Sequence, residues 1–191
     1  NGTVAVGREA LFALTTGSAN IAVGYQALDA ITTSNYSVAV GHQALSAQNR
    51  SGDTWNTAVG YLAGLDITSG SNNVAVGANA LENGQTGGSC TAVGSQAMQT
   101  GVAGDYNTGI GAHSLLNVTG TNNTAVGASS GNLITSGGSN TIIGYDADVD
   151  ANDRDGCIVI GSGLSLNTAS DNVVEIGNNT NSMTYDLDGG D

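Results

Sequence analysis

The sequence has no proline and no lysine, and it has only one tryptophan and one phenylalanine among its 191 residues. Bulky side chains are too few for the thick, interdigitated core of a compact enzyme. Small residues dominate instead, and 30 of them are glycine. The composition therefore favours a thin and regular core.

Positive charge is also scarce, because three arginines stand against sixteen acidic residues and give a formal net charge of −13. Clustered Lys and Arg are needed to neutralise phosphates, so we expect no nucleic-acid partner. An anionic membrane surface is disfavoured for the same reason. No run of about 18 apolar residues and no signal segment is present, so we expect no membrane insertion.

One phrase recurs along the whole chain, as in "NIAVGYQAL" at 20–28, "SVAVGHQAL" at 37–45 and "NNVAVGANAL" at 72–81. The glycine that follows its Val-Ala-Val trace, here called the repeat glycine, returns every 16 to 19 residues. Its eleven positions are Gly7, Gly24, Gly41, Gly60, Gly77, Gly94, Gly111, Gly127, Gly144, Gly161 and Gly177. Such a fixed period indicates a repeat array.

The period predicts an all-β parallel β-solenoid of about eleven coils over residues 1–177, with 178–191 as an exit segment toward a following domain. The first residues already lie inside a repeat, so we expect a segment of a longer chain. A helix is excluded because a few apolar residues followed by glycine and turn-forming residues cannot sustain a 3.6-residue stripe. We expect two short strands per coil, the second over phrases such as Ala27-Leu28 and Ala80-Leu81, and a rod about 50 Å long at roughly 4.8 Å per coil.

The first strand carries β-branched residues directly before and three before the repeat glycine, and alanine lies between them in seven copies. The residue before the glycine is always valine or isoleucine, as in Val23, Val40, Val59, Val76 and Val93. We expect the β-branched face to fill the interior. The alanine face then needs a cover, and packing against copies of the chain, as a homotrimer about an axis parallel to the rod, would supply it. The alternative is a monomer whose alanines fit a tight bend.

Asparagine recurs four residues before the repeat glycine, as in Asn20, Asn56 and Asn73. Stacked amides can bond coil to coil, so we interpret this column as structural. Cys90 and Cys157 stand at the same position four coils apart, on the order of 19 Å, which is too far for a disulfide.

The repeats "NIAVGYQAL", "NTAVGYLAG" and "NNTAVGASS" resemble those of phage tail-fibre-type proteins, and they are similar to the "SVAIG"-type repeats in the heads of YadA-like trimeric autotransporter adhesins. The resemblance extends from Thr3 to Gly177. It implies a left-handed β-roll and a trimer. The adhesin repeat is shorter than 17 residues, and the terminal "EIGNNTNSMTYDLDGGD" is more similar to tail fibres.

Two features are candidate binding sites, and the histidines and glutamates bear on catalysis. The segment 46–56 has the only 19-residue spacing, and its Arg50 and Trp55 are candidate receptor contacts, because exposed aromatics suit sugar stacking. Asp146, Asp148 and Asp150 alternate as in calcium loops, although glycine is missing from the sixth position, so calcium is a possible ligand and no other cofactor is expected. His42 and His113 lie four coils apart and the three glutamates are scattered, so we expect no enzyme.

These observations favour a structural fibre segment of a phage tail fibre or similar viral appendage. The chain would pair with copies of itself, with other fibre or virion proteins, and with a host-surface receptor or glycan. It would be located in the virion. The alternative is the head of a bacterial trimeric autotransporter adhesin at the cell surface. An ice-binding solenoid and a polysaccharide depolymerase are the further alternatives.

Overall fold

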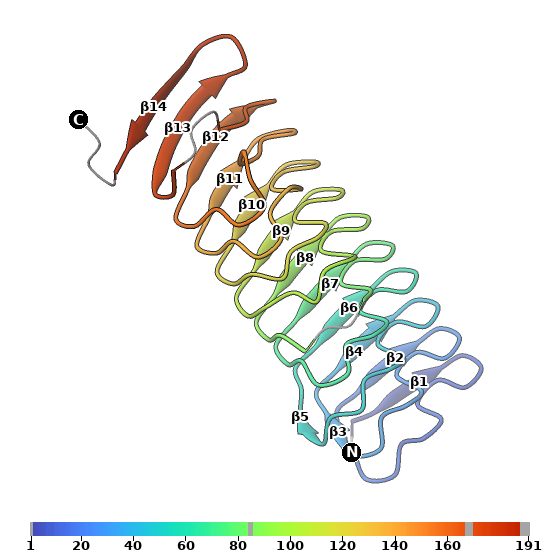
Figure 1. Ribbon diagram of the computed structural model, residues 1–191. Coiled ribbons are helices and arrows are strands. Elements are labelled where there is room, and N and C mark those ends of the chain that lie inside the picture. Colours follow the sequence, from blue (N-terminus) through green and yellow to red (C-terminus); the bar gives the residue numbers. More distant parts are fainter. Residues whose placement is uncertain (1, 84–85, 167–169, 188–191) are drawn as a thin grey trace.

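The computed structural model describes residues 2–83, 86–166 and 170–187, and in those residues it is all-β without a helix (Figure 1). The chain forms a parallel β-solenoid of about 10 turns. Its strands are β1 (Val4–Val6), β2 (Ile21–Val23), β3 (Ser34–Asn35), β4 (Val38–Val40), β5 (Gly52–Asp53), β6 (Thr57–Val59), β7 (Val74–Val76), β8 (Thr91–Val93), β9 (Thr108–Ile110), β10 (Thr124–Val126), β11 (Thr141–Ile143), β12 (Ile158–Ser162), β13 (Val173–Asn178) and β14 (Ser182–Asp186).

One 12-stranded sheet runs the length of the rod in the order β1-β2-β4-β6-β7-β8-β9-β10-β11-β12-β13-β14. Every strand up to β13 pairs in parallel with its counterpart one repeat away, so that Val4 lies beside Ile21 and Ala5 beside Ala22. This register confirms the repeat array. The eleven parallel strands enclose about 10 turns rather than eleven coils, because the last strand has no further turn above it.

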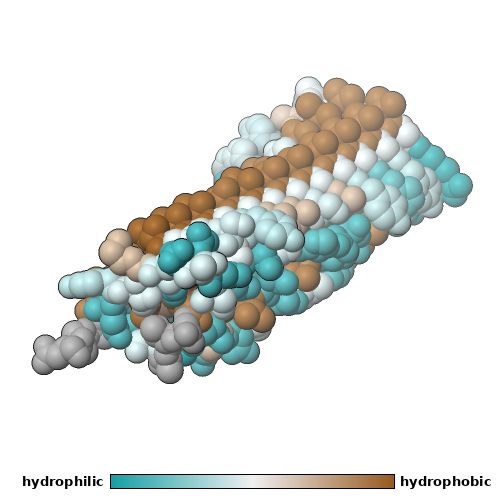
Figure 2. Space-filling view, turned by 90° about the horizontal axis from the view of Figure 1, so that it is seen from above, coloured by the Kyte–Doolittle hydropathy of each residue, from teal (hydrophilic) through white to brown (hydrophobic). Residues whose placement is uncertain are grey.

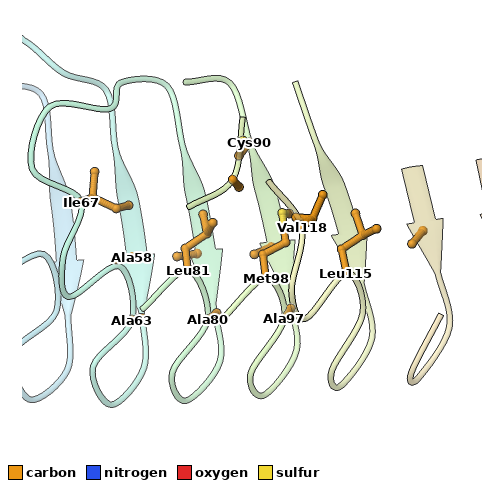
Figure 3. Close-up of a cluster of buried hydrophobic side chains, with 14 of the residues drawn as sticks. Ala58, Ala63, Ile67, Ala80, Leu81, Cys90, Ala97, Met98, Leu115 and Val118 are labelled. Carbon is orange, nitrogen blue, oxygen red and sulfur yellow. The ribbon is translucent and has the colours of Figure 1, made fainter. Parts of the chain in front are cut away.

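The alanine column between the β-branched residues faces the interior, and the expectation that it lies outside is wrong. Ala22, Ala39, Ala58, Ala75 and Ala92 are completely buried within a single chain. Larger side chains from the opposite wall fill the space beside them, as Leu81, Met98 and Leu115 do in Figure 3. A narrow coil holds one bulky layer, so the facing strand must be small.

The Ala-Leu phrases form turns, so the predicted second strand is also wrong. In these phrases the second and fourth residues after the repeat glycine have positive φ, for example 51° at both Gln26 and Leu28 and 53° at both Gln43 and Leu45. Alternating left-handed residues are incompatible with an extended strand. Hydrogen bonds still join neighbouring turns here, since the amide of Leu28 donates to the carbonyl of Ala44 at 3.1 Å.

The repeat glycines allow neighbouring turns to approach closely. Gly77 has a φ of +132°, and a Cβ placed on it would lie 2.5 Å from the carbonyl oxygen of Gly94 in the next turn. Both the left-handed backbone and the missing side chain are therefore needed at this position.

The asparagine column is buried and joins each turn to the next. The side-chain oxygen of Asn20 accepts from the amide of Ser37 at 2.9 Å, and its Nδ2 donates to the carbonyl of Ser34 at 2.7 Å. Asn56, Asn73, Asn107, Asn123 and Asn140 repeat this pattern. The column thus satisfies backbone groups that the loops would otherwise leave buried and unpaired.

The sheet ends in an antiparallel hairpin. β14 pairs with β13, with Met183 opposite Ile176 and Tyr185 opposite Val174. The residues 178–191, predicted as an exit segment, therefore begin within β13 and include β14, and 188–191 lie outside the described residues.

Candidate interaction surfaces

The β-branched residues form an outward face along the rod, here called the valine face. It consists of the residues three before and one before each repeat glycine, and the column directly before the glycine is valine or isoleucine in every repeat. These side chains are half-buried or exposed, for example 39% at Val59 and 41% at Ile110. Figure 2 shows a hydrophobic band along the rod, which the valine and isoleucine side chains of this face account for.

Acidic residues are absent from the valine face and its border. None of the sixteen acidic residues stands three before, one before or one after a repeat glycine. The hairpin prolongs the same surface, because Met183 and Tyr185 of β14 lie opposite the outward residues Ile176 and Val174 of β13. The band thus crosses the whole sheet without an acidic residue.

Threonine shares this outward face. Thr91, Thr108, Thr124 and Thr141 occupy the same position in four consecutive turns and are half-buried. They belong to the face that the sequence predicted to be interior.

Aromatic residues at equivalent positions in neighbouring turns form two stacks. Tyr25, His42 and Tyr61 each follow a repeat glycine, and the ring centroids are 5.1 Å and 5.3 Å apart in succession. The guanidinium of Arg8 lies 5.6 Å from the Tyr25 ring centroid, which extends this stack toward the N-terminal end. Tyr36 and Trp55, each five residues before a repeat glycine, stack with centroids 5.9 Å apart and planes within 6°.

The two candidate receptor residues lie in one anchored bulge. Buried Gln48 fixes the bulge, because its Nε2 donates to the hydroxyl oxygens of Ser37 and Thr54 and its Oε1 accepts from Asn56. Trp55 is 52% exposed, and Arg50 is exposed as well. The long spacing therefore inserts a buried polar network whose outer residues face solvent.

A polar trough of about 290 Å³ lies beside this bulge. Arg50 lines it together with Ser69, Gly70, Ser71, Asn72, Thr86, Gly88, Ser89, Asp105 and Tyr106. Trp55 stands next to the trough in the column that continues through Asn72, Ser89 and Tyr106. The sequence analysis identified Arg50 and Trp55 but not Asp105 and Tyr106, which are neighbours in the turn three repeats further on.

The structure does not bring the three candidate metal ligands together. Asp148 is only 8% exposed, and its two oxygens accept from the amides of Leu133 and Val149 at 2.8 Å and 2.9 Å. Asp150 binds Arg154 at 2.7 Å, which lowers its pKa, and Asp146 is exposed. In the described parts of the chain, no three His, Cys, Asp or Glu residues are grouped to hold a metal ion.

Burial raises the pKa of Asp148 to about 6, while backbone hydrogen bonds from the Leu133 and Val149 amides oppose this shift. Burial also raises the pKa of the thiols of Cys90 and Cys157, which are free. Both thiols are therefore kept neutral and unreactive. Each of the two cysteines occupies a position in the asparagine column, four residues before a repeat glycine, where other turns carry a small polar residue.

No family model, curated protein or solved structure matches this chain. Across the described residues, the structure holds no helix with the length and apolar character needed to cross a bilayer.

Proposed function

We propose that this chain is a structural segment of a phage tail fibre or a similar viral appendage, where it forms a rigid rod that serves host attachment. The role is mechanical and not enzymatic. The observation that carries it is the valine face, an uncharged band of valine, isoleucine and threonine on a chain whose net charge is −13.

Copies of the chain cover this face. The band is about 50 Å long and on the order of 10 Å wide, or roughly 500 Å² per chain. That area is near the upper end of what monomers expose, and two such faces together reach the roughly 1,000 Å² of a specific interface. The absence of carboxylates lets strongly acidic copies approach there without burying like charges.

The repeat resemblance supports three copies about an axis parallel to the rod. Coil-to-coil hydrogen bonds through the asparagine column make each copy stiff along its length. A stiff trimer presents every surface feature three times, so weak contacts with a host surface are multiplied by avidity. Other fibre or virion proteins and a host-surface receptor are the partners of such a rod.

The head of a bacterial trimeric autotransporter adhesin is the alternative, because the same uncharged face suits both assemblies. Immunogold electron microscopy with antibodies against the chain separates them. Label on the tail fibres of virions supports the proposal, and label on the surface of uninfected bacteria supports the adhesin. Label on neither structure contradicts both.

Ice binding is a second candidate because Thr91, Thr108, Thr124 and Thr141 face outward in four consecutive turns. A regular, flat rank of hydroxyl and methyl groups on a solenoid is the arrangement it requires. Thermal hysteresis of the purified chain tests it, and its absence excludes this role.

A further inference from the structure

We propose that the trough beside the 46–56 bulge binds a short acidic saccharide, with the sugar carboxylate on Arg50 and a sugar ring against Tyr106. The proposal gives the attachment role a ligand, and only in that sense does it rest on the proposed function. The trough itself is built by a single chain.

Arg50 supplies an unpaired positive charge. The other two arginines form ion pairs, Arg8 with Glu9 at 3.0 Å and Arg154 with Asp150 at 2.7 Å. In the described part of the chain Arg50 has no such partner within ion-pair distance. In a chain of net charge −13, a free guanidinium at a concave surface is a specific place for a carboxylate.

The backbone holds Arg50 in place. The hydroxyl of buried Ser34 donates to the Arg50 carbonyl, and β5 pairs with β3 through Gly52 and Ser34. Gln48, two residues before Arg50, is fixed by three side-chain hydrogen bonds in the core. The bulge is thus preorganised, so binding orders little additional chain.

The rest of the trough matches sugar chemistry. The hydroxyls of Ser69, Ser71, Thr86 and Ser89 can each donate and accept. One oxygen of Asp105 accepts from the amide of Gly88 at 2.7 Å, which orients the carboxylate and leaves the other oxygen to accept from sugar hydroxyls. Tyr106 is 64% exposed and offers a flat apolar wall.

The column of residues five before the repeat glycine explains the length of the trough, because it has an aromatic side chain at each end and smaller side chains between them. Trp55 and Tyr106 occupy the same position three turns apart, about 14 Å at roughly 4.8 Å per turn. Asn72 and Ser89, with smaller side chains, occupy the two positions between them. This gap in the column, with its volume of about 290 Å³, fits one or two sugar rings rather than a long polymer.

The test is mapping by nuclear magnetic resonance of the labelled chain titrated with digalacturonate and with sialyllactose, each paired with its neutral methyl ester. We expect the amides around Arg50, Ser71, Ser89 and Tyr106 to shift with at least one of the two acids, with a Kd on the order of 1 mM. Arg50→Gln should weaken binding of that acid about tenfold and leave the ester within about twofold.

Tyr106→Asn should weaken acid and ester alike, and it is tolerated by the backbone because Asn72 and Asn122 stand in the same left-handed column. Arg8→Gln is the matched control and should bind like the unchanged chain. Absence of shifts with both acids, shifts elsewhere on the rod, or unchanged binding in Arg50→Gln and Tyr106→Asn overturns the proposal.

The oligomeric state of the same samples separates the two proposals. A monomer that binds the acid through Arg50 leaves this site standing and contradicts the trimeric fibre. A trimer that binds neither acid contradicts this site and leaves the trimeric fibre standing.

Discussion

The side-chain oxygen of Asn56 accepts a 2.9 Å hydrogen bond from the backbone amide of Asn73, which stands at the same position one turn along the rod. Asn73 in turn accepts from the amide of Cys90 at 2.9 Å and donates to the carbonyl of Gly87 at 3.1 Å. Both residues are buried. Each asparagine therefore joins its own turn to a short segment of the next turn, where it pairs with one amide and one carbonyl.

Replacing Asn73 by alanine should destabilise the rod. The substitution leaves the amide of Cys90 and the carbonyl of Gly87 buried without these partners, which costs about 2–4 kcal/mol of unfolding free energy. Chemical denaturation measures the change. Asn152→Ala is the control, because Asn152 is exposed, and it should alter stability by less than about 0.5 kcal/mol. Equal effects of the two substitutions would contradict a structural role for the column.

Gly77→Ala should be more damaging than Gly52→Ala. Both glycines have positive φ, +132° and +82°, so both variants carry backbone strain of about 1–3 kcal/mol. Only at Gly77 would the new methyl group meet the next turn, 2.5 Å from the carbonyl oxygen of Gly94, whereas nothing lies within 4 Å at Gly52. The difference between their melting temperatures isolates the close approach of the turns, and identical melting temperatures would show that it is unimportant.

Glu175→Ala should stabilise the chain. Glu175 stands in the alanine column of the last parallel strand, is only 3% exposed, and its Oε2 atom is buried without a hydrogen-bond partner. Removing an unsatisfied polar group from the interior gains about 1–3 kcal/mol. Denaturation of Glu175→Ala and Glu175→Gln checks this, with the glutamine variant expected to gain less. A loss of stability in both variants would contradict burial of this carboxylate without a partner.

Asp148 should make the rod more stable in mild acid. Its folded-state pKa of about 6 is above the ordinary 3.8, so between these values the folded chain binds more protons than the unfolded chain. The unfolding free energy contributed by this group therefore falls as pH rises from about 4 to 6, by up to about 3 kcal/mol. In Asp148→Asn this part of the pH dependence should vanish. A variant with the same pH profile as the unchanged chain would assign the effect to other groups.

The period of the repeat was sufficient to predict the solenoid, but not which face of its strand lies inside. Both faces of Val-Ala-Val are apolar, so alternation alone gives no direction. The sizes of the side chains at two positions of the repeat do indicate which face lies inside. Two turns with a large apolar residue in the alanine column, Ile142 and Val159, have Asp148 and Ser165 at the position where most turns carry leucine or methionine. This exchange of volume indicates that the two columns face one another.

The turn at the Ala-Leu phrase was hidden for a different reason. Leucine at a positive φ is unusual, and only the repetition of close turn-to-turn contacts holds Leu28, Leu45 and Leu81 there. The trough was hidden because Arg50 and Tyr106 are 56 residues apart and meet only through stacking of turns. The bulge itself was visible as the 19-residue spacing.

The mass of the purified chain in solution, measured by light scattering over a dilution series, tests whether three chains assemble through the valine face. The valine face should hold three chains together, so we expect three times 18.8 kDa, stable on dilution. Val76→Asp with Val93→Asp places two charges per chain on that face and should release monomers that keep the solenoid's circular dichroism spectrum. A persistent 18.8 kDa particle from the unchanged chain would contradict the trimeric fibre.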